Sequence, residues 1–319
     1  METKSVVIDV DVGADDAWAL LLALNNEKLG NYKIRAITCT FGNTTLENVG
    51  KNVLKVLETV DRLDIPIFLG SSEPLIIHSP KNGEKDENFH GSDGLGDVID
   101  PKTHLNPDLL QKTSAIEAIR DILLCDKNVH LICLGPLTNI ALLLKMHPNV
   151  RDKIREITIM GGNRHGVGNI TRAAEFNFHC DPEAAFIVFQ SARCPIKLLP
   201  LESVKHNKMI EKSWRFDVLG KVDGKITKLM NPIEEKLLSR SNFWYPFDAY
   251  AVASFIKPEI VKRETNLHVT IELGGFFTRG QVVIDHVGKE KCKNVTVFEE
   301  IDIEMFRNLM KEVVDAQKN

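Results

Sequence analysis

Four carboxylates stand at the end of a short apolar run near the start of the chain, and their crowding is the first feature that could do chemistry. The run, residues 6–10, predicts a buried parallel strand. The four acids are Asp9, Asp11, Asp15 and Asp16. No Lys or Arg lies among them, and like charges held this close raise one another's pKa unless a cation joins them. Because carboxylate oxygens suit Ca²⁺ and Mg²⁺, the cluster predicts a divalent metal site.

A structural role explains only part of this cluster. Residues 17–22 are good helix formers, so Asp15 or Asp16 could cap a helix and favour its dipole. Gly13 allows a tight turn between the strand and that helix. Capping does not require four acids, so the metal site is the favoured interpretation. We expect it at the carboxyl end of the strand, where open α/β sheets keep their sites.

The elements that must position these acids alternate along the chain. The apolar runs that predict strands are residues 6–10, 33–40, 64–70, 129–134, 155–160 and 194–201. Helical patterns lie between most of them, which predicts an α/β fold with a mostly parallel, doubly wound central sheet and helices on both faces. No linker interrupts residues 1–319, so a single domain is expected. Residues 203–245 are predicted to be a helical insertion that forms one wall of the pocket. Two or three short strands over 266–300 and a closing helix over 301–316 should follow.

Composition narrows the class of partner. The chain has 319 residues and a formal net charge of -4, which gives no reason to expect attraction to nucleic acid or to a membrane. Its start carries no signal-peptide pattern, and no long apolar segment predicts a membrane span. The six cysteines lack CxxC spacing and indicate reduced thiols. These features predict a cytoplasmic protein with a small-molecule partner.

Two further polar groups lie in loops or turns. Residues 71–112 show little periodicity and contain His90 in the run HGSDGLGD; from composition alone, a solvated surface loop is as good an explanation as a functional one. The turn GPLTN at residues 135–139 places Thr138 directly after a predicted strand, where it could simply cap the next helix.

A third group lies after the strand 155–160. Glu175 and Asn177 alternate with Phe176, so in an extended segment the two polar side chains face one way and suit the hydroxyls of a sugar. A surface pair is the alternative explanation. Asp181 precedes Pro182 and is predicted to cap a helix, which is a structural role.

The run DVDVGADDAWA at residues 9–19 resembles the N-terminal motif DxDxGxDDAxA of the inosine-uridine-preferring nucleoside hydrolase family. The HG loop, the GPLTN turn, MGG at 160–162, EFN at 175–177 and the segment that ends at Asp248 resemble that family's later motifs in the same order. The resemblance implies a hydrolase that cleaves the N-glycosidic bond of ribonucleosides to free base and ribose, through a transition state that resembles an oxocarbenium ion. It also implies a homodimer or homotetramer.

The same resemblance implies a role for each matched residue. Ca²⁺ is expected to be held by Asp11, Asp16, the Thr138 carbonyl and Asp248. Asp11 is expected to be the catalytic base that takes a proton from a Ca²⁺-bound water. The ribose is expected to contact Asp15, Met160, Asn169, Glu175 and Asn177. The residues expected at or near the base are Asn43, His90, Phe176, Trp244, Tyr245 and Phe247.

The chain departs from many family members at Phe247. The non-specific members have His immediately before the final Asp and use it as a general acid, whereas Phe cannot donate a proton. The purine-preferring branch has an aromatic residue there, which stacks on the base. We therefore predict a preference for purine nucleosides, with Tyr245 or His90 as alternative proton donors. Taken singly, each aromatic residue is explained equally well as part of the core.

Two other functions stay open on the sequence. The missing His is compatible with a nucleoside-binding or sensing protein that has lost catalysis, although such a protein has little need of a proton acceptor beside a metal. A metal-dependent phosphotransferase with Asp9 or Asp11 as nucleophile also begins with DxDx, but it requires Thr or Val where Gly13 stands.

Overall fold

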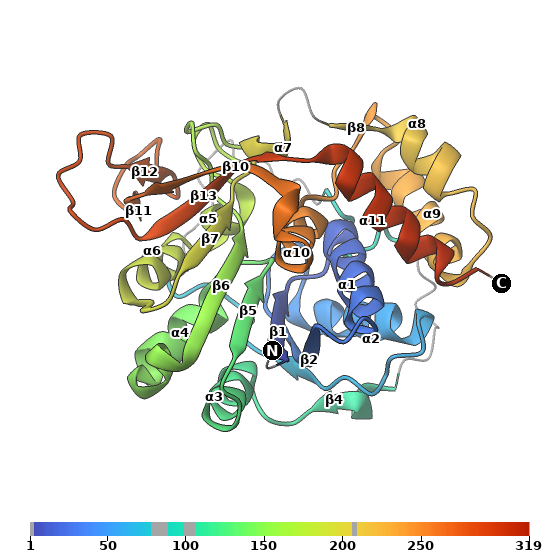
Figure 1. Cartoon of the computed structure of the whole chain (residues 1–319), viewed down its shortest axis with the longest axis horizontal. Coiled ribbons are helices and arrows are strands. Elements are labelled where there is room, and N and C mark those ends of the chain that lie inside the picture. The colour runs from blue at the N-terminus through green and yellow to red at the C-terminus, as the bar shows by residue number, and fades with distance from the viewer. Residues whose placement is uncertain (1–2, 78–88, 99–105, 206–208, 319) are drawn as a thin grey trace.

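The strand that carries the first acids lies in the middle of the central sheet. The computed structural model describes residues 3–77, 89–98, 106–205 and 209–318. In the part described, β1 (Lys4–Val10) pairs in parallel with β2 (Tyr32–Cys39) on one side and with β5 (Val129–Cys133) on the other. Residues Val6–Val10 are fully buried, as their unbroken apolar pattern predicts for a strand covered on both faces. Figure 1 shows this strand inside the molecule.

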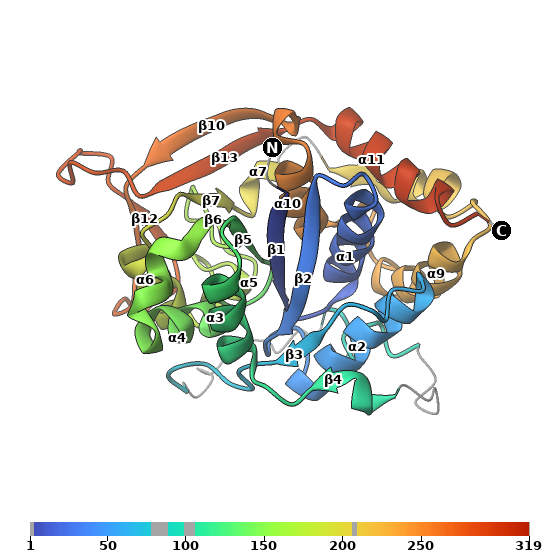
Figure 2. The ribbon, with the colours of Figure 1, turned by 60° about the horizontal axis from the view of Figure 1, so that its bottom comes forward.

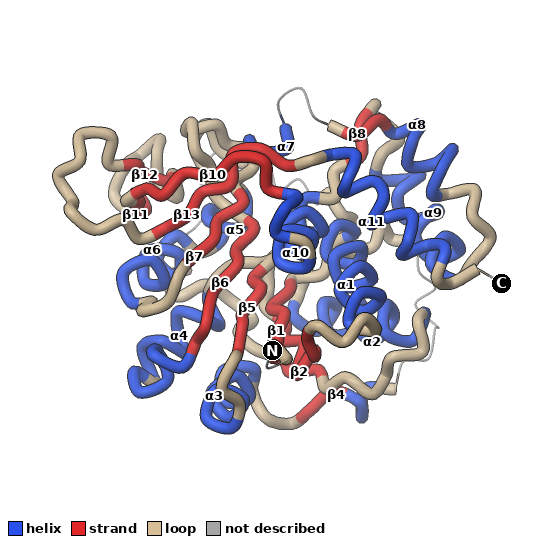
Figure 3. The backbone as a smooth tube through the Cα atoms, in the orientation of Figure 1, coloured by secondary structure: helices blue, strands red, loops and turns tan. Residues whose placement is uncertain are grey.

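The sheet grows outward from β1 in both directions. Its described strands have the order β10-β13-β7-β6-β5-β1-β2-β3-β4, and every neighbouring pair is parallel except β10 with β13 (Figure 3). The strands not yet given are β3 (Ile67–Leu69), β4 (Leu110–Gln111), β6 (Ile154–Met160), β7 (Ile196–Leu199), β10 (Val261–Leu267) and β13 (Val295–Ile301). The chain leaves β1 toward β2, β3 and β4, and then returns to the other side of β1 for β5, β6 and β7. The order therefore reverses between β1 and β5, and loops after neighbouring strands diverge at such a switch point to leave a crevice.

Helices cover the two faces of the sheet, as the alternating pattern predicts. One layer contains α1 (Ala14–Glu27), α2 (Leu46–Thr59), α10 (Phe247–Ile256) and α11 (Ile303–Asp315). The other contains α3 (Ala115–Cys125), α4 (Thr138–Met146) and α6 (Pro182–Ser191). Figure 2 shows the two sets on opposite sides of the strands. The molecule is therefore a single α/β domain with a mostly parallel central sheet.

The insertion after β7 forms a small unit beside α1 and α11 (Figure 1). Its elements are α7 (Glu202–Lys205), β8 (Ile210–Glu211), α8 (Lys212–Trp214), the π-helix η3 (Arg215–Leu219), α9 (Lys225–Leu237) and β9 (Phe243–Trp244). Gly220 follows η3 and Gly224 precedes α9, so the two glycines separate these helices. Near the opposite end of the sheet, β11 (Val269–Ile271) and β12 (Val282–Ile284) form a separate hairpin.

The structure departs from the expected boundaries in several places. β10 precedes the range 266–300 in which the last strands were expected, and the strand expected over 194–201 spans only Ile196–Leu199. The third strand is shorter than predicted, at Ile67–Leu69. The segment with Glu175 and Asn177 is not extended: it forms the short helix α5 (Phe176–Cys180), with Glu175 as its N-cap. The alternation of Glu, Phe and Asn is therefore not a strand pattern, because Glu175 turns its carboxylate back to accept the first N–H groups of a helix.

Among the described residues, no helix combines the length and apolar character that crossing a membrane requires. Cys39, Cys125, Cys133, Cys194 and Cys292 are free thiols.

Candidate active site

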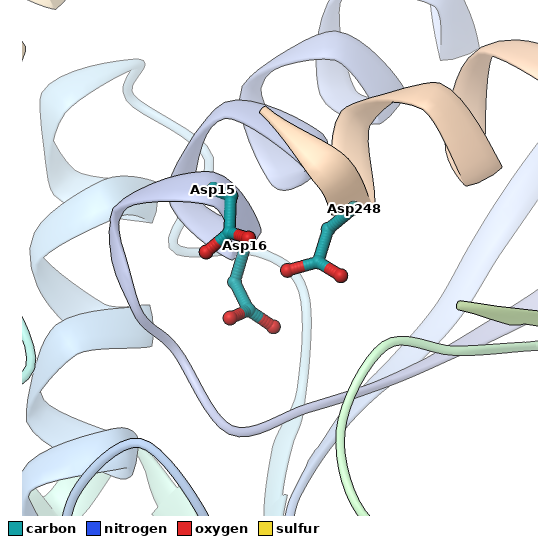
Figure 4. Close-up of side chains that lie close together, drawn as sticks. All are labelled: Asp15, Asp16 and Asp248. Carbon is teal, nitrogen blue, oxygen red and sulfur yellow. The ribbon is translucent and has the colours of Figure 1, made fainter. Parts of the chain in front are cut away.

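The acids converge from two helices that start at the same end of the sheet. Asp15 and Asp16 lie in the first turn of α1, and Asp248 lies in the first turn of α10. Figure 4 shows the three carboxylates pointing toward one another. Within the described residues, one carboxylate oxygen from each of these three side chains lies within 4.8 Å of the other two. This arrangement could hold a metal ion, and it includes Asp15, which the family resemblance assigned to the ribose.

Asp16 also fixes the start of its own helix. Its Oδ2 accepts the Gly13 N–H at 2.9 Å, so the predicted cap is present. Gly13 itself has an extended backbone (φ -92°), so it does not serve the predicted tight turn. Glycine is needed because a Cβ at this position would lie 2.8 Å from the ring of His90.

Asp11 lies beyond the end of β1 and is enclosed by backbone. A Cβ at Gly42 would lie 2.0 Å from its Oδ2, and a Cβ at Gly135 would lie 2.8 Å from its Oδ1. Its Oδ2 accepts the Asn43 N–H at 2.8 Å, whereas its Oδ1 is buried without a hydrogen-bond partner. The amide of Asn43 reaches Asp16 Oδ2 at 3.4 Å. The predicted base therefore has one fixed oxygen and one unused oxygen.

Burial and mutual repulsion raise the pKa of every acid in the cluster. Burial raises the pKa of Asp15 and of Asp16 from 3.8 to about 7, and for Asp16 the charge of Asp15 adds to the effect. The pKa values of Asp11 and Asp248 are raised well above 3.8, again mainly by burial and then by neighbouring acids. A cation in the cluster would reverse these shifts.

The chemistry of the donors fits a divalent metal. Asp15 Oδ1, like Asp11 Oδ1, is buried and accepts no hydrogen bond, which is costly unless another partner is present. No Lys or Arg forms an ion pair with these four carboxylates among the described contacts. Buried carboxylates with unused oxygens and no paired cation are the ligand set that hard cations prefer.

Thr138 is the first residue of α4, and it is held by Asp181. Leu137 is the N-cap, so the interpretation of Thr138 as the cap is wrong. The Thr138 hydroxyl donates to Asp181 Oδ2 at 2.7 Å. Asp181 also caps α6 by accepting the Ala184 N–H at 2.9 Å, which confirms its predicted structural role.

Asp9 is separate from the cluster. Its Oδ1 accepts hydrogen bonds from Thr38 Oγ1 at 2.5 Å and from Asn139 Nδ2 at 2.8 Å. Asn139 also accepts the Ser71 N–H at 2.9 Å. Burial raises the pKa of Asp9 to about 7. Asp9 thus joins the strand ends, and sequence reasoning missed the role of Asn139 although it closes the GPLTN turn.

The residues predicted to contact ribose lie at the ends of β5 and β6. The Asn177 amide donates to the carbonyls of Leu134 at 2.7 Å and Met160 at 3.1 Å. Glu175 accepts the Gly162 N–H at 2.7 Å, and burial raises its pKa to about 7. Asn169 lies in an exposed part of the loop between β6 and α5. These contacts fix Glu175 and Asn177 from within the protein before any ligand arrives.

An aromatic group stands between the acids and the solvent. The rings of Tyr245 and Phe247 stack at a centroid distance of 5.8 Å and an angle of 27°. Phe89, which is 48% exposed, contacts the rings of both His90 and Tyr245. His90 Nδ1 accepts the Ala14 N–H at 3.1 Å, which leaves the proton on Nε2, 3.5 Å from Asp15 Oδ1. Burial lowers the pKa of His90 to about 4.

Two aromatic residues of the predicted set lie elsewhere. Trp244 is 2% exposed and packs edge-on against Trp18, so its described contacts are those of a core residue. Phe176 is half-buried at the start of α5, beside Glu175. Sequence alone could not separate core aromatics from those at the site, because both types are Phe, Tyr or Trp in one apolar segment.

Comparisons with known proteins agree with this geometry. The model of the inosine-uridine preferring nucleoside hydrolase family matches residues 6–308. The pyrimidine-specific ribonucleoside hydrolase RihA of Enterobacter sp. (strain 638) is 34% identical, with 96% of each chain covered. A solved inosine-guanosine nucleoside hydrolase is 32% identical, with a TM-score of 0.87 over 98% of this chain and 99% of that one. A purine-preferring ribonucleoside hydrolase from Gardnerella vaginalis, 24% identical with a TM-score of 0.85 over 98% of each chain, has the same fold.

The acid cluster at the switch point and the match over most of the length have one explanation: the chain belongs to the inosine-uridine preferring nucleoside hydrolase family, and it is a ribonucleoside hydrolase.

Proposed function

We propose that this enzyme prefers purine ribonucleosides, which it hydrolyses to free base and ribose with the help of Ca²⁺. The observation that carries the base preference is the stack of Tyr245 on Phe247, immediately before Asp248. Relatives of similar identity differ in the base that their names give, pyrimidine at 34% and inosine or guanosine at 32%. Overall identity therefore does not decide the preference, and the local chemistry of the pocket must.

A flat aromatic stack favours the larger base. A purine offers more ring area than a pyrimidine for stacking on Phe247 and Tyr245. Phe247 cannot donate a proton, so the leaving base must be able to accept one elsewhere, and a purine has a basic ring nitrogen remote from the glycosidic bond. Tyr245 keeps a phenolic hydroxyl, 3.0 Å from Ser241 Oγ, that can act as the donor.

Asp11 is the proposed base toward the attacking water. Its unused Oδ1, which faces Gly135, is free to accept a proton, while the Asn43 N–H holds Oδ2 in place beside Gly42. The neighbouring carboxylates favour the positive charge that develops on the ribose in the transition state.

Asp11, Asp16, the Thr138 carbonyl and Asp248 are the proposed ligands of the ion, and the position of Asp15 makes it a further candidate. When bound, Ca²⁺ acts as a Lewis acid that makes a water more acidic and orients the ribose diol. Glu175, Asn177, Asn169, Asp15 and the Met160 backbone are proposed to hold the ribose. The family resemblance supports a homodimer or homotetramer, which light scattering of the purified protein can test, and the scattered cysteines without CxxC spacing support a cytoplasmic location.

The test is steady-state kinetics on inosine, guanosine, uridine and cytidine, with free ribose as the readout. We expect the highest kcat/KM on a purine nucleoside and loss of activity in a chelator. In a Phe247→His variant, kcat/KM for uridine should rise relative to that for inosine, because the variant regains a general acid. In Phe247→Leu, kcat/KM for inosine should fall without a rise for uridine. A wild-type kcat/KM that is higher for uridine contradicts the purine preference. A protein that only binds nucleosides, without catalysis, would release no ribose.

A further inference from the structure

A buried ion pair beside the site has no part in the proposed chemistry. Arg215 in η3 and Glu234 in α9 are joined by a contact of 2.5 Å between Nε and Oε2, and their side chains are 0% and 4% exposed. Arg215 Nη1 also donates to Asn231 at 2.9 Å, whereas its Nη2 is buried without a hydrogen-bond partner. Burying two charges is expensive, and apolar side chains of similar volume would stabilise a core at least as well. The pair therefore calls for an explanation other than stability.

The pair touches both sides of the candidate active site. On one side, Glu234 Oε1 accepts the indole N–H of Trp244 at 2.5 Å. Trp244 is the residue before Tyr245, so this bond fixes the start of the segment that carries the aromatic stack and Asp248. On the other side, the Arg215 guanidinium lies 4.9 Å from the ring centroid of Trp18. Trp18 lies on α1, one turn after Asp15.

The helix α9, which carries Glu234, also contacts the loop that bears His90. A Cβ at Gly96 would lie 3.1 Å from the Ile233 carbonyl, so the loop backbone packs directly on α9 next to Glu234. Lys236 on this helix lies 3.5 Å from Asp97. The helix therefore contacts the loop that bears His90 as well as the aromatic segment.

Directional bonds distinguish this junction from ordinary core packing. A carboxylate shared between a guanidinium and an indole N–H fixes the orientation of the Trp244 ring, which apolar contacts alone leave freer. We propose that Arg215 and Glu234 are positioning residues that set the Tyr245–Phe247 stack relative to the acids of α1, and that they thereby set the selectivity between bases. This inference rests on the proposed role of that stack in binding the base.

The first test replaces the pair by apolar residues of similar size, in the double variant Arg215→Met/Glu234→Leu. We expect the ratio of kcat/KM between inosine and uridine to move toward one, with a loss of roughly tenfold to a hundredfold on the better substrate, as for a misplaced binding group. Glu234→Gln keeps an acceptor for the Trp244 N–H, so it should recover much of the ratio. A ratio equal to that of the wild type in the folded double variant overturns the proposal.

A second variant covers the case in which the double variant does not fold. Trp244→Phe removes the indole N–H together with part of the ring and leaves the ion pair in place, and a reduced ratio is expected from it too. If this folded variant keeps the wild-type ratio, the proposal is overturned.

The matched control is Arg279→Met/Glu183→Leu, which removes an ion pair of 2.6 Å between α6 and the β11–β12 turn, on the far side of the molecule from α9 (Figure 1). It should lower the melting temperature without changing the ratio.

The two proposals fail in different ways. A wild-type enzyme that prefers uridine contradicts the purine preference, but a change of the ratio in the pair variants still supports the positioning role. A wild-type enzyme that prefers inosine, with an unchanged ratio in all folded pair variants, contradicts the positioning role alone.

Discussion

Asp11, just beyond the end of β1, differs from Asp9 within β1 in how its carboxylate is held. Each has one buried oxygen without a hydrogen-bond partner, but the other oxygen of Asp9 is held by the side chains of Thr38 and Asn139, whereas that of Asp11 is held by the Asn43 N–H, and the charge of Asp11 acts on Asp248. We expect Asp11→Asn to lower kcat by roughly 10²–10⁴-fold, the range for removing a general base. The metal-free variant should unfold at the same temperature as the wild type or higher, because the change removes a carboxylate whose pKa burial has raised. Steady-state kinetics and thermal denaturation measure the two effects.

The matched control for this experiment is Asp9→Asn. It removes an equally buried carboxylate two residues earlier in the chain and leaves Asp11 intact, so its loss of kcat should be less than about tenfold. Full activity of Asp11→Asn, or an equal loss in the two variants, contradicts the assignment of Asp11 as base.

Gly13 is a position where the added methyl group alone can be tested. Its backbone is extended, so alanine causes no backbone strain, and the cost must come from the contact of 2.8 Å with the His90 ring. We expect Gly13→Ala to destabilise the protein by about 1–3 kcal/mol, the range for overpacking a filled site. Chemical denaturation measures this free energy of unfolding. The variant Gly13→Ala/His90→Ala should recover most of it, and a cost that is the same with and without His90 contradicts the stated cause.

At the scale of elements, the loop between β6 and α5 depends on one acid from the next strand end. Glu202 lies at the start of α7, buried, and accepts the N–H groups of Arg164 at 2.8 Å, His165 at 3.0 Å and Val167 at 3.3 Å. The same loop carries Asn169. We expect Glu202→Ala to raise KM by roughly tenfold, which corresponds to about 1.4 kcal/mol of lost binding, while kcat changes little.

Glu272 offers a control for this change. Its Oε1 accepts the N–H groups of Gly274 at 2.7 Å and Gly275 at 3.0 Å in the β11–β12 turn, so Glu272→Ala removes bonds of the same kind from a loop without a proposed ligand. Its KM should equal that of the wild type. If Glu202→Ala also keeps the wild-type KM, the loop does not depend on Glu202 for binding.

The sequence predicts an element well where its signal is local. Asp181 caps α6 as its position before Pro182 predicts, because a cap needs only the next three residues. The prediction fails where a residue type is unusual for its role. Glu175 was placed in an extended segment because Glu is not among the preferred N-cap residues, although its partners Asn177 and Phe178 are local. Distant partners give no signal in the sequence, as with the bond from the Trp244 indole to Glu234 on another element.

At the scale of the whole molecule, the fold places acids from distant parts of the sequence in one crevice. The strand order reverses between β1 and β5, so the loops after these strands separate, and α10 brings Asp248 to the same end from far along the chain. The parallel sheet and its two helix layers were predicted from alternation alone. The inclusion of Asp15 in the closest group of ligand atoms was not, because the sequence gives the spacing along α1 but not the direction from which α10 arrives.

We expect this convergence to make the stability of the molecule depend on pH together with calcium, the proposed ion. Asp15 and Asp16 have pKa values of about 7 in the folded, metal-free protein, against 3.8 ordinarily. Between about pH 4 and pH 7 the unfolded chain has released these protons while the folded chain retains them, so the cluster's contribution to the free energy of unfolding falls as the pH rises.

Calcium binds the ionised acids and must displace the protons, so it should raise the melting temperature little near pH 5 and by several degrees near pH 8. Thermal scans with calcium and with a chelator at the two pH values measure this difference. Asp248→Asn should abolish most of the calcium effect at the higher pH, whereas Asp285→Asn, a change at a partly exposed acid of the turn after β12, should leave it intact. An equal effect of calcium at both pH values contradicts the cluster as its binding site.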